Sequence, residues 1–181
     1  MRFFFWNLAR KSLADLVHIA VQLYDVDVAA FAEADQTDFQ RLTDLLGGRY
    51  RTVESIDGRT KTKLLVKSSI CSQQASAVIK NLTCTLILDG VPVNTSIVHL
   101  PDKRNDPQGD HRERIIRKLV SEINTTKTSY PGSFNMLIGD FNCNPFDPEM
   151  VKLDSLNSTF FKEVAKRLKE RESDGSSYPV M

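Results

Sequence analysis

Four apolar runs in this chain each end in a polar residue that can bind a metal ion or move a proton. The clearest run spans residues 135–138, breaks at Gly139 and is followed by Asp140 and Asn142. Strand side chains alternate with period two, so Asp140 and Asn142 project to one side if the extended backbone continues through Phe141. Gly139 lets another backbone or a ligand come close. The simpler alternative is an Asx-type turn that closes a core strand.

The first two runs predict a strand, a helix and a second strand. Residues 3–6 are aromatic and lead into Asn7, while residues 26–31 are nearly all apolar and are followed by Glu33. Between them, apolar side chains recur at helical spacing, which predicts one buried face made of Leu13, Leu16, Val17, Ala20, Val21 and Tyr24. Two strands joined in this way are parallel, so Asn7 and Glu33 are expected at the same edge of a sheet.

The middle of the chain changes to period two. Residues 36–46 predict a short helix, and residues 50–99 predict antiparallel strands with a hairpin turn at Asp89-Gly90. The last of these strands ends in His99. A lone histidine beside apolar neighbours is more often a core group than a catalyst, so both interpretations stay open.

The second half of the chain predicts two further helices, and the chain contains two further histidines. Residues 115–123 and 160–168 have helical spacing, and residues 171–177 form a polar tail. The first of these helices is followed by a strand that leads to Asp140. His111, in the corner where the loop meets the helix, is a weaker catalytic candidate than His99, and His18 is interpreted as structural or surface.

Composition narrows the function classes. The chain has 181 residues and a net charge of +1, which predicts a single domain without a whole-molecule attraction to polyanions. No apolar run is long enough to span a bilayer, and residues 3–6 are too short for a signal peptide. The odd cysteine count fits a reducing compartment, so a cytoplasmic protein is expected.

Basic residues cluster in the middle of the chain. They form either a patch that attracts phosphate or solvated charges on edge strands. The members of this cluster are Arg49, Arg51, Arg59, Lys61, Lys63 and Lys67.

The polar residues at the strand ends are sufficient for metal-assisted phosphoryl transfer. Mg²⁺ prefers oxygen ligands and keeps several waters, so a carboxylate with a carboxamide nearby is a suitable cradle. An aspartate can orient or deprotonate the attacking water, and a histidine can donate to the phosphate or to the leaving oxygen. The set consists of Asn7, Glu33, His99, Asp140 and Asn142.

The motifs Trp6-Asn7, Ala32-Glu33, His99-Leu100 and Gly139-Asp140-Phe141-Asn142 occur in this order over residues 2–150. In this the chain resembles the endonuclease/exonuclease/phosphatase superfamily, which has the deoxyribonuclease-I-like fold. The resemblance implies an α/β (α+β) protein, a four-layer αββα sandwich of two mixed β-sheets flanked by helices, and a phosphoesterase that depends on Mg²⁺, with Mn²⁺ as a substitute.

The resemblance also implies a role for each site residue. Glu33 is the main metal ligand, and Asn7 is its neighbour at the metal. Asp140 positions the nucleophile, and Asn142 holds the scissile phosphate. His99 stabilises the phosphate or assists the leaving group.

One part of the family pattern is missing. Members of the superfamily close with a second aspartate and a Ser-Asp-His motif, whereas this chain has only His18, His99 and His111. Residues 1–181 are therefore expected to be the N-terminal two thirds of the fold, a truncated fragment with one sheet incomplete. The predicted function is a phosphodiesterase or nuclease, and the alternative is a non-catalytic binding module or inactive fragment. DNA, RNA, a phospholipid head group and an inositol phosphate remain open as substrates, with the basic residues favouring nucleic acid.

Overall fold

The structure is a computed structural model that describes residues 1–54, 60–72, 76–78, 81–129, 132–144, 146–152, 156, 170–173 and 176–179. Its backbone forms two compact units. The first comprises residues 1–99 and 126–140, and the second comprises residues 100–125 and 141–181. Each unit is described by itself below.

A four-stranded sheet forms one half of the first unit. Its strands are β1 (Phe3–Asn7), β2 (Val28–Ala32), β4 (Lys63–Lys67) and β3 (Tyr50–Val53), in that order. β1 and β2 are parallel and are joined through α1 (Ala14–Leu23), which confirms the predicted strand–helix–strand unit. The other two pairs are antiparallel, so the sheet is mixed.

A five-stranded sheet forms the other half. β7 and β8 are antiparallel and turn at Asp89 and Gly90, whose φ values are 51° and 80°, as the predicted hairpin requires. β8 and β9 are parallel, so this sheet is also mixed. Its strands are β5 (Cys71–Ser72), β6 (Ser76–Val78), β7 (Asn81–Leu88), β8 (Val91–His99) and β9 (Phe134–Asp140).

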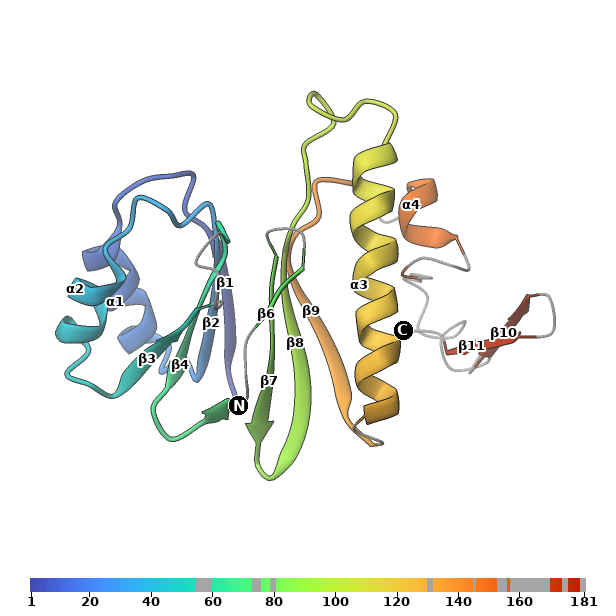
Figure 1. Ribbon diagram of the computed structural model, residues 1–181. Helices are drawn as coiled ribbons and strands as arrows, with labels where there is room; N and C mark the ends of the chain where they lie inside the picture. Colours follow the sequence, from blue (N-terminus) through green and yellow to red (C-terminus); the bar gives the residue numbers. More distant parts are fainter. Residues whose placement is uncertain are drawn as a thin grey trace. The chain divides into compact units, whose positions relative to one another are not determined.

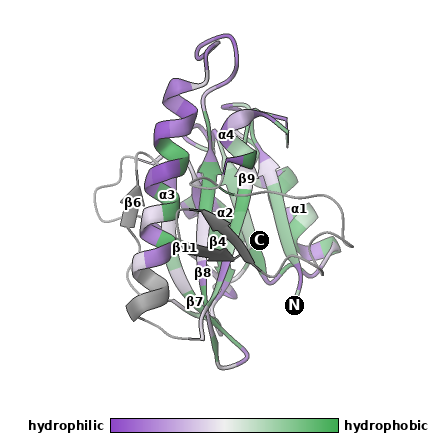
Figure 2. Cartoon of the chain, turned by 90° about the vertical axis from the view of Figure 1, so that its right-hand side faces the viewer, coloured by the Kyte–Doolittle hydropathy of each residue, from purple (hydrophilic) through white to green (hydrophobic). Residues whose placement is uncertain are grey.

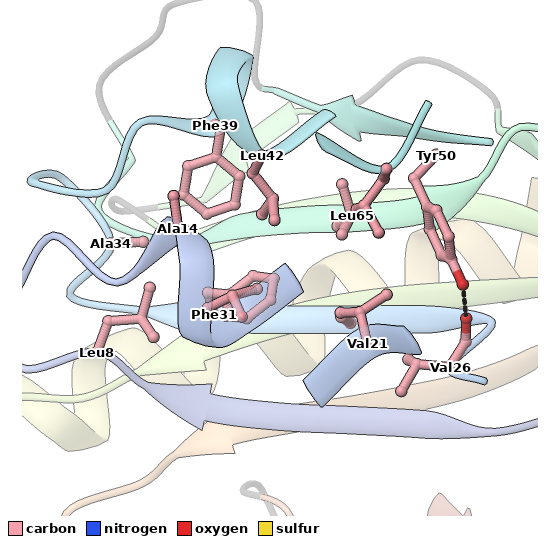
Figure 3. Close-up of a cluster of buried hydrophobic side chains, with 13 residues drawn as sticks. Leu8, Ala14, Val21, Val26, Phe31, Ala34, Phe39, Leu42, Tyr50 and Leu65 are labelled. Carbon is pink, nitrogen blue, oxygen red and sulfur yellow. Dashed lines mark hydrogen bonds between the residues drawn. The ribbon is translucent and has the colours of Figure 1, made fainter. Parts of the chain in front are cut away.

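Two hydrophobic clusters hold these layers together. α1 and α2 (Phe39–Leu45) pack on one face of the four-stranded sheet, where Phe31 meets Phe39 at 5.5 Å between ring centroids (Figures 1 and 3). Tyr50 closes this cluster by donating a hydrogen bond to the carbonyl of Val26 at 2.7 Å. The second cluster joins the two sheets, with Leu64 of β4 and Leu86 of β7 fully buried. The predicted class, two mixed sheets with helices in an α+β sandwich, is confirmed.

The buried face of α1 is narrower than the spacing of its apolar residues predicts. Ala14, Val17 and Val21 are buried, whereas Leu16 is 53% exposed and Tyr24 is 59% exposed. A helix that covers one sheet buries a single stripe, and the apolar residues beside that stripe stay on the surface.

The second unit contains most of α3 (Asp110–Ser129), together with α4 (Pro148–Val151). α3 alternates hydrophilic with hydrophobic residues along its length (Figure 2). β10 (Glu170–Ser173) and β11 (Ser176–Pro179) pair as an antiparallel hairpin in the segment that the sequence marks only as a polar tail. The helix predicted at 160–168 lies outside the described residues. Of the helices that the structure describes, none has the length and apolar character needed to cross a bilayer.

Gly139 sets the contact between β8 and β9. It pairs with Val98 in the parallel ladder, and a Cβ atom at position 139 would overlap the backbone oxygen of Val98. The prediction that this glycine lets another backbone come close is therefore confirmed. The next residue in each strand, His99 and Asp140, forms the last pair of the ladder.

We expect Gly139→Ala to lower the free energy of unfolding by about 2 kcal/mol or more, because the backbone oxygen of Val98 cannot move without breaking the ladder. Gly90→Ala is the control, since Gly90 also has a positive φ but has no atom within 4 Å of its Cβ position. The control should lose only about 1 kcal/mol. Chemical denaturation measures both losses, and equal losses would contradict the close contact at Gly139.

Candidate active site

Four of the five predicted site residues lie at carboxyl ends of parallel strands in the first unit. Asn7 ends β1, Glu33 follows β2 directly, and His99 and Asp140 end β8 and β9. Within each sheet the parallel ladder places the neighbouring ends together, because Asn7 pairs with Ala32 and His99 pairs with Asp140. The residues therefore come from both sheets.

Asn7 joins two carboxylates. Its Nδ2 donates to Glu33 Oε1 at 3.2 Å and to Asp140 Oδ2 at 3.0 Å. Its Oδ1 accepts a hydrogen bond from the backbone N–H of Ala9 at 2.9 Å. An N–H group can only donate, so this last bond fixes which end of the amide faces the carboxylates.

Glu33 is the centre of the cluster. Its Oε1 also lies 3.4 Å from His99 Nε2, and its side chain is 24% exposed. Glu33 has a φ of 47°, a conformation that non-glycine residues rarely adopt and that occurs often at functional sites.

Arg10 also lies at this site, which the sequence did not indicate. Its Nε is 3.6 Å from Glu33 Oε2, and its backbone N–H donates to the carbonyl of Glu33 at 3.0 Å. Ala9 and Arg10 both have left-handed φ values, 49° and 57°. That turn brings Arg10 back to Glu33, and no sequence pattern predicted it.

His99 is 21% exposed at its side chain and is held through its main chain. Its backbone N–H donates to Asn81 Oδ1 at 2.9 Å, although Asn81 was not among the predicted site residues. His111 belongs to the second unit, where its backbone N–H donates to Asp106 at 3.3 Å. Among the described residues, Nε2 of His18 on α1 has no hydrogen-bond partner.

Asn142 belongs to the second unit. β9 ends at Asp140, and Asn142 has a φ of 49°, so the period-two alternation does not continue through Phe141. Its Nδ2 donates to the carbonyl of Leu100 at 2.9 Å. Its predicted role at the phosphate stays a prediction.

A buried ion-pair network holds the segment after Asn142. Arg112 Nε lies 2.8 Å from Glu149 Oε1, and both side chains are more than 90% buried. Arg112 also donates to the carbonyl of Asp106 at 2.9 Å. Burial alone would raise the pKa of Asp106, but backbone N–H groups and the Arg112 guanidinium hold it below its usual value. The network joins the loop, the start of α3 and α4 within the second unit.

No protein-family model and no curated protein matches the chain by sequence. Solved structures do match it. Humanized TDP2 from D. rerio is 18% identical with a TM-score of 0.61, over 77% of this chain and 61% of that one. Sphingomyelinase C from Streptomyces griseocarneus is 16% identical with a TM-score of 0.62, over 82% and 67%. ANGEL2 is 18% identical with a TM-score of 0.57, over 75% and 45%.

The chain has the deoxyribonuclease-I-like fold. This is the fold of the endonuclease/exonuclease/phosphatase superfamily that the ordered motifs predicted. The chain spans less than two thirds of the length of the TDP2 and ANGEL2 structures.

The donor set at this edge of the deoxyribonuclease-I-like fold fits a hard divalent cation. Two carboxylates, Glu33 and Asp140, converge on a single amide group. The described residues contain no group of three His, Cys, Asp or Glu side chains arranged as a metal cage. Mg²⁺ does not need such a cage, because it is usually held by one or two carboxylates and completes its shell with waters and substrate phosphate.

The predicted basic cluster is largely engaged in other contacts. Lys67 lies 2.6 Å from Asp27 and 2.9 Å from Asp25, and its hydrogen bonds lower the pKa of both carboxyl groups. Lys63 lies 2.6 Å from Glu54. Arg51 donates to the carbonyl of Ile70 at 2.7 Å and to Ser72, while Arg59 lies outside the described residues. These pairings count against a phosphate-binding patch at Arg51, Lys63 and Lys67. Solvated charges on an edge strand do not describe Lys63 and Lys67 either, because both are ion-paired and lie on β4, an inner strand of its sheet.

We expect Asn7→Leu to lower the free energy of unfolding by about 1–3 kcal/mol, since both carboxylates lose their shared donor. Asn7→Asp should cost more, because it adds a third carboxylate. Asn105 makes a similar bond to Asp102 on the surface, so Asn105→Leu should stay within about 0.5 kcal/mol of the native protein. Urea titration checks the order, and equal losses at positions 7 and 105 would contradict it.

Proposed function

We propose that this chain carries the catalytic edge of a metal-dependent phosphodiesterase. The observation that carries the proposal is the convergence of four polar side chains from both sheets. The amide of Asn7 donates to Glu33 and to Asp140, and Nε2 of His99 lies 3.4 Å from Oε1 of Glu33. A packed sandwich does not need two carboxylates and an imidazole at one edge, and like charges that meet there destabilise the fold unless a cation or a donor compensates them.

Structural neighbours support the phosphate-ester class. One TDP2 structure from D. rerio contains a single-strand DNA product, and ANGEL2 is a 2′,3′-cyclic phosphatase solved with adenosine-2′,3′-vanadate. Sphingomyelinase C shares the same fold. The neighbours thus support a phosphodiester as substrate and leave open whether it is nucleic acid or lipid.

The carboxylate of Glu33 would hold the metal ion, with Asn7 beside it. A bound Mg²⁺ or Mn²⁺ would supply charge neutralisation at the phosphate and would favour ionisation of water. Asn7 fixes the two carboxylates by donating to both, so neither needs to reorient when substrate enters.

The remaining residues would act on the substrate. Asp140 orients the attacking water by accepting its proton or its hydrogen bond, and Asn142 donates to a phosphate oxygen. His99, beside Glu33, donates to the phosphate or to the leaving oxygen. Arg10 adds a guanidinium at the same edge, and its planar fork suits phosphate oxygens.

The test is cleavage of plasmid DNA, RNA and bis(p-nitrophenyl) phosphate in Mg²⁺ or Mn²⁺, with EDTA as the metal control. We expect Glu33→Gln to reduce the rate by roughly a hundredfold or more, because it removes the main anionic ligand while keeping the shape of the side chain. Glu54→Gln is the matched control, because Glu54 is an exposed carboxylate paired with Lys63, and it should keep the native rate.

Cleavage that persists unchanged in Glu33→Gln or in EDTA would contradict the proposal. A protein that cleaves none of the three substrates but binds single-stranded DNA in a fluorescence-anisotropy titration would support the non-catalytic binding module instead.

A further inference from the structure

We propose that Asn81 is a positioning residue that holds His99 against Glu33, as part of a hydrogen-bonded link between the two sheets. The proposal deepens the proposed function, since it assigns a residue that sets the geometry of that same site. It rests on the buried side chain of Asn81, on the bond that this side chain makes, and on the contacts of the neighbouring backbone.

A buried asparagine at position 81 lowers the stability of the fold unless its amide group is hydrogen-bonded. It is the first residue of β7 and is 1% exposed. Its Oδ1 accepts a hydrogen bond from the backbone N–H of His99, which fixes the orientation of the amide group. Its Nδ2 then has no hydrogen-bond partner among the described residues. A buried donor without a partner costs free energy. The contribution that offsets this cost is the bond to His99.

This bond continues the β7–β8 ladder beyond its main-chain part. The regular pairing ends at Leu82 and Ile97, two residues before His99. Beyond that point the side chain of Asn81 supplies the acceptor that a backbone carbonyl supplies elsewhere in a ladder. The main chain of His99 pairs with Asp140 of β9 on one side, and the bond from Asn81 fixes it on its β7 side as well.

A second buried side chain connects Asn81 to the other sheet. Thr62 is fully buried, and its hydroxyl accepts the backbone N–H of Leu82 at 3.1 Å. The residue before it, Lys61, accepts the backbone N–H of Ala34 at 3.1 Å. Three hydrogen bonds thus link the two strand ends. Ala34, the residue after Glu33, bonds to Lys61, and Thr62 bonds to Leu82. Asn81, the neighbour of Leu82, bonds to His99.

The link matters because Glu33 and His99 belong to different sheets. The 3.4 Å distance between Nε2 of His99 and Oε1 of Glu33 depends on the relative position of the two sheets at this edge. Apolar packing between the sheets is not directional, whereas hydrogen bonds fix the positions of the atoms that they join. The link fixes the main chain beside both residues. Its loss should let the imidazole of His99 move away from Glu33 while the sandwich stays folded.

The test is a double-mutant cycle that does not depend on activity. The chain has three histidines, so the Cε1–H resonance of His99 can be assigned in a ¹H–¹³C spectrum with His18→Gln and His111→Gln. Glu33→Gln should shift this resonance in the native background, because Oε1 lies beside Nε2. In Asn81→Ala and in Thr62→Val the same change should shift it by less than half as much.

Two variants separate positioning from general stability. Asn81→Asp keeps an oxygen for the His99 N–H, so it should keep most of the native response to Glu33→Gln. Thr85→Val removes another buried hydroxyl of β7, one that donates to Asn94 at 2.8 Å, and should leave the response unchanged. Should Asn81→Ala fail to fold, Thr62→Val carries the test.

An undiminished response in Asn81→Ala or Thr62→Val would overturn the proposal, as would an equal reduction in Thr85→Val. On any phosphodiester that the protein cleaves, Asn81→Ala should also lower kcat by about tenfold while KM changes less than twofold. An absence of cleavage counts against the proposed function alone, because the spectra decide the positioning role without turnover.

Discussion

The amide of Asn7 is the contact on which the candidate site depends. It donates to Glu33 of one sheet and to Asp140 of the other, so two like charges from different layers share one donor. The amide keeps this orientation because its oxygen accepts the N–H of Ala9. A site built from two sheets needs such a bridge, since strand ends that belong to separate ladders have no main-chain hydrogen bonds in common.

Backbone conformation brings the other groups to this bridge. The close pairing of Gly139 with Val98 places Asp140 beside His99 at the end of the parallel ladder. Glu33, the residue after β2, has a positive φ, and Arg10 lies beside its carboxylate after two residues of left-handed φ, Ala9 and Arg10 itself. Strain of this kind persists where the surrounding structure fixes it, and here fully buried residues such as Phe31 and Ile97 support the strands.

Much of this architecture could be predicted from the sequence because strand ends leave a signal. Apolar runs that stop at Asn7, Glu33, His99 and Asp140 indicated the edge of the sheets, and the structure brings these four residues together. Arg10 and Asn81 left no such signal. Arg10 reaches the site through a turn of two residues with left-handed φ. Asn81 is a single polar residue in a buried strand, and its role follows only from its hydrogen bond to His99, 18 positions away in the sequence. Leu16 of α1 was predicted to be buried but is exposed. The spacing of apolar residues shows which side of the helix is apolar, but it does not show how much of that side the sheet covers.

The most direct test of the account is to locate the metal ion by Mn²⁺ titration of ¹⁵N-labelled protein. Paramagnetic broadening should appear first at the backbone amides of Asn7, Glu33, His99 and Asp140, should saturate, and should be lost in Glu33→Gln. Broadening that begins elsewhere, such as at the exposed carboxylate Asp15, or that is unchanged in Glu33→Gln, would contradict a metal-dependent phosphoesterase site at this edge.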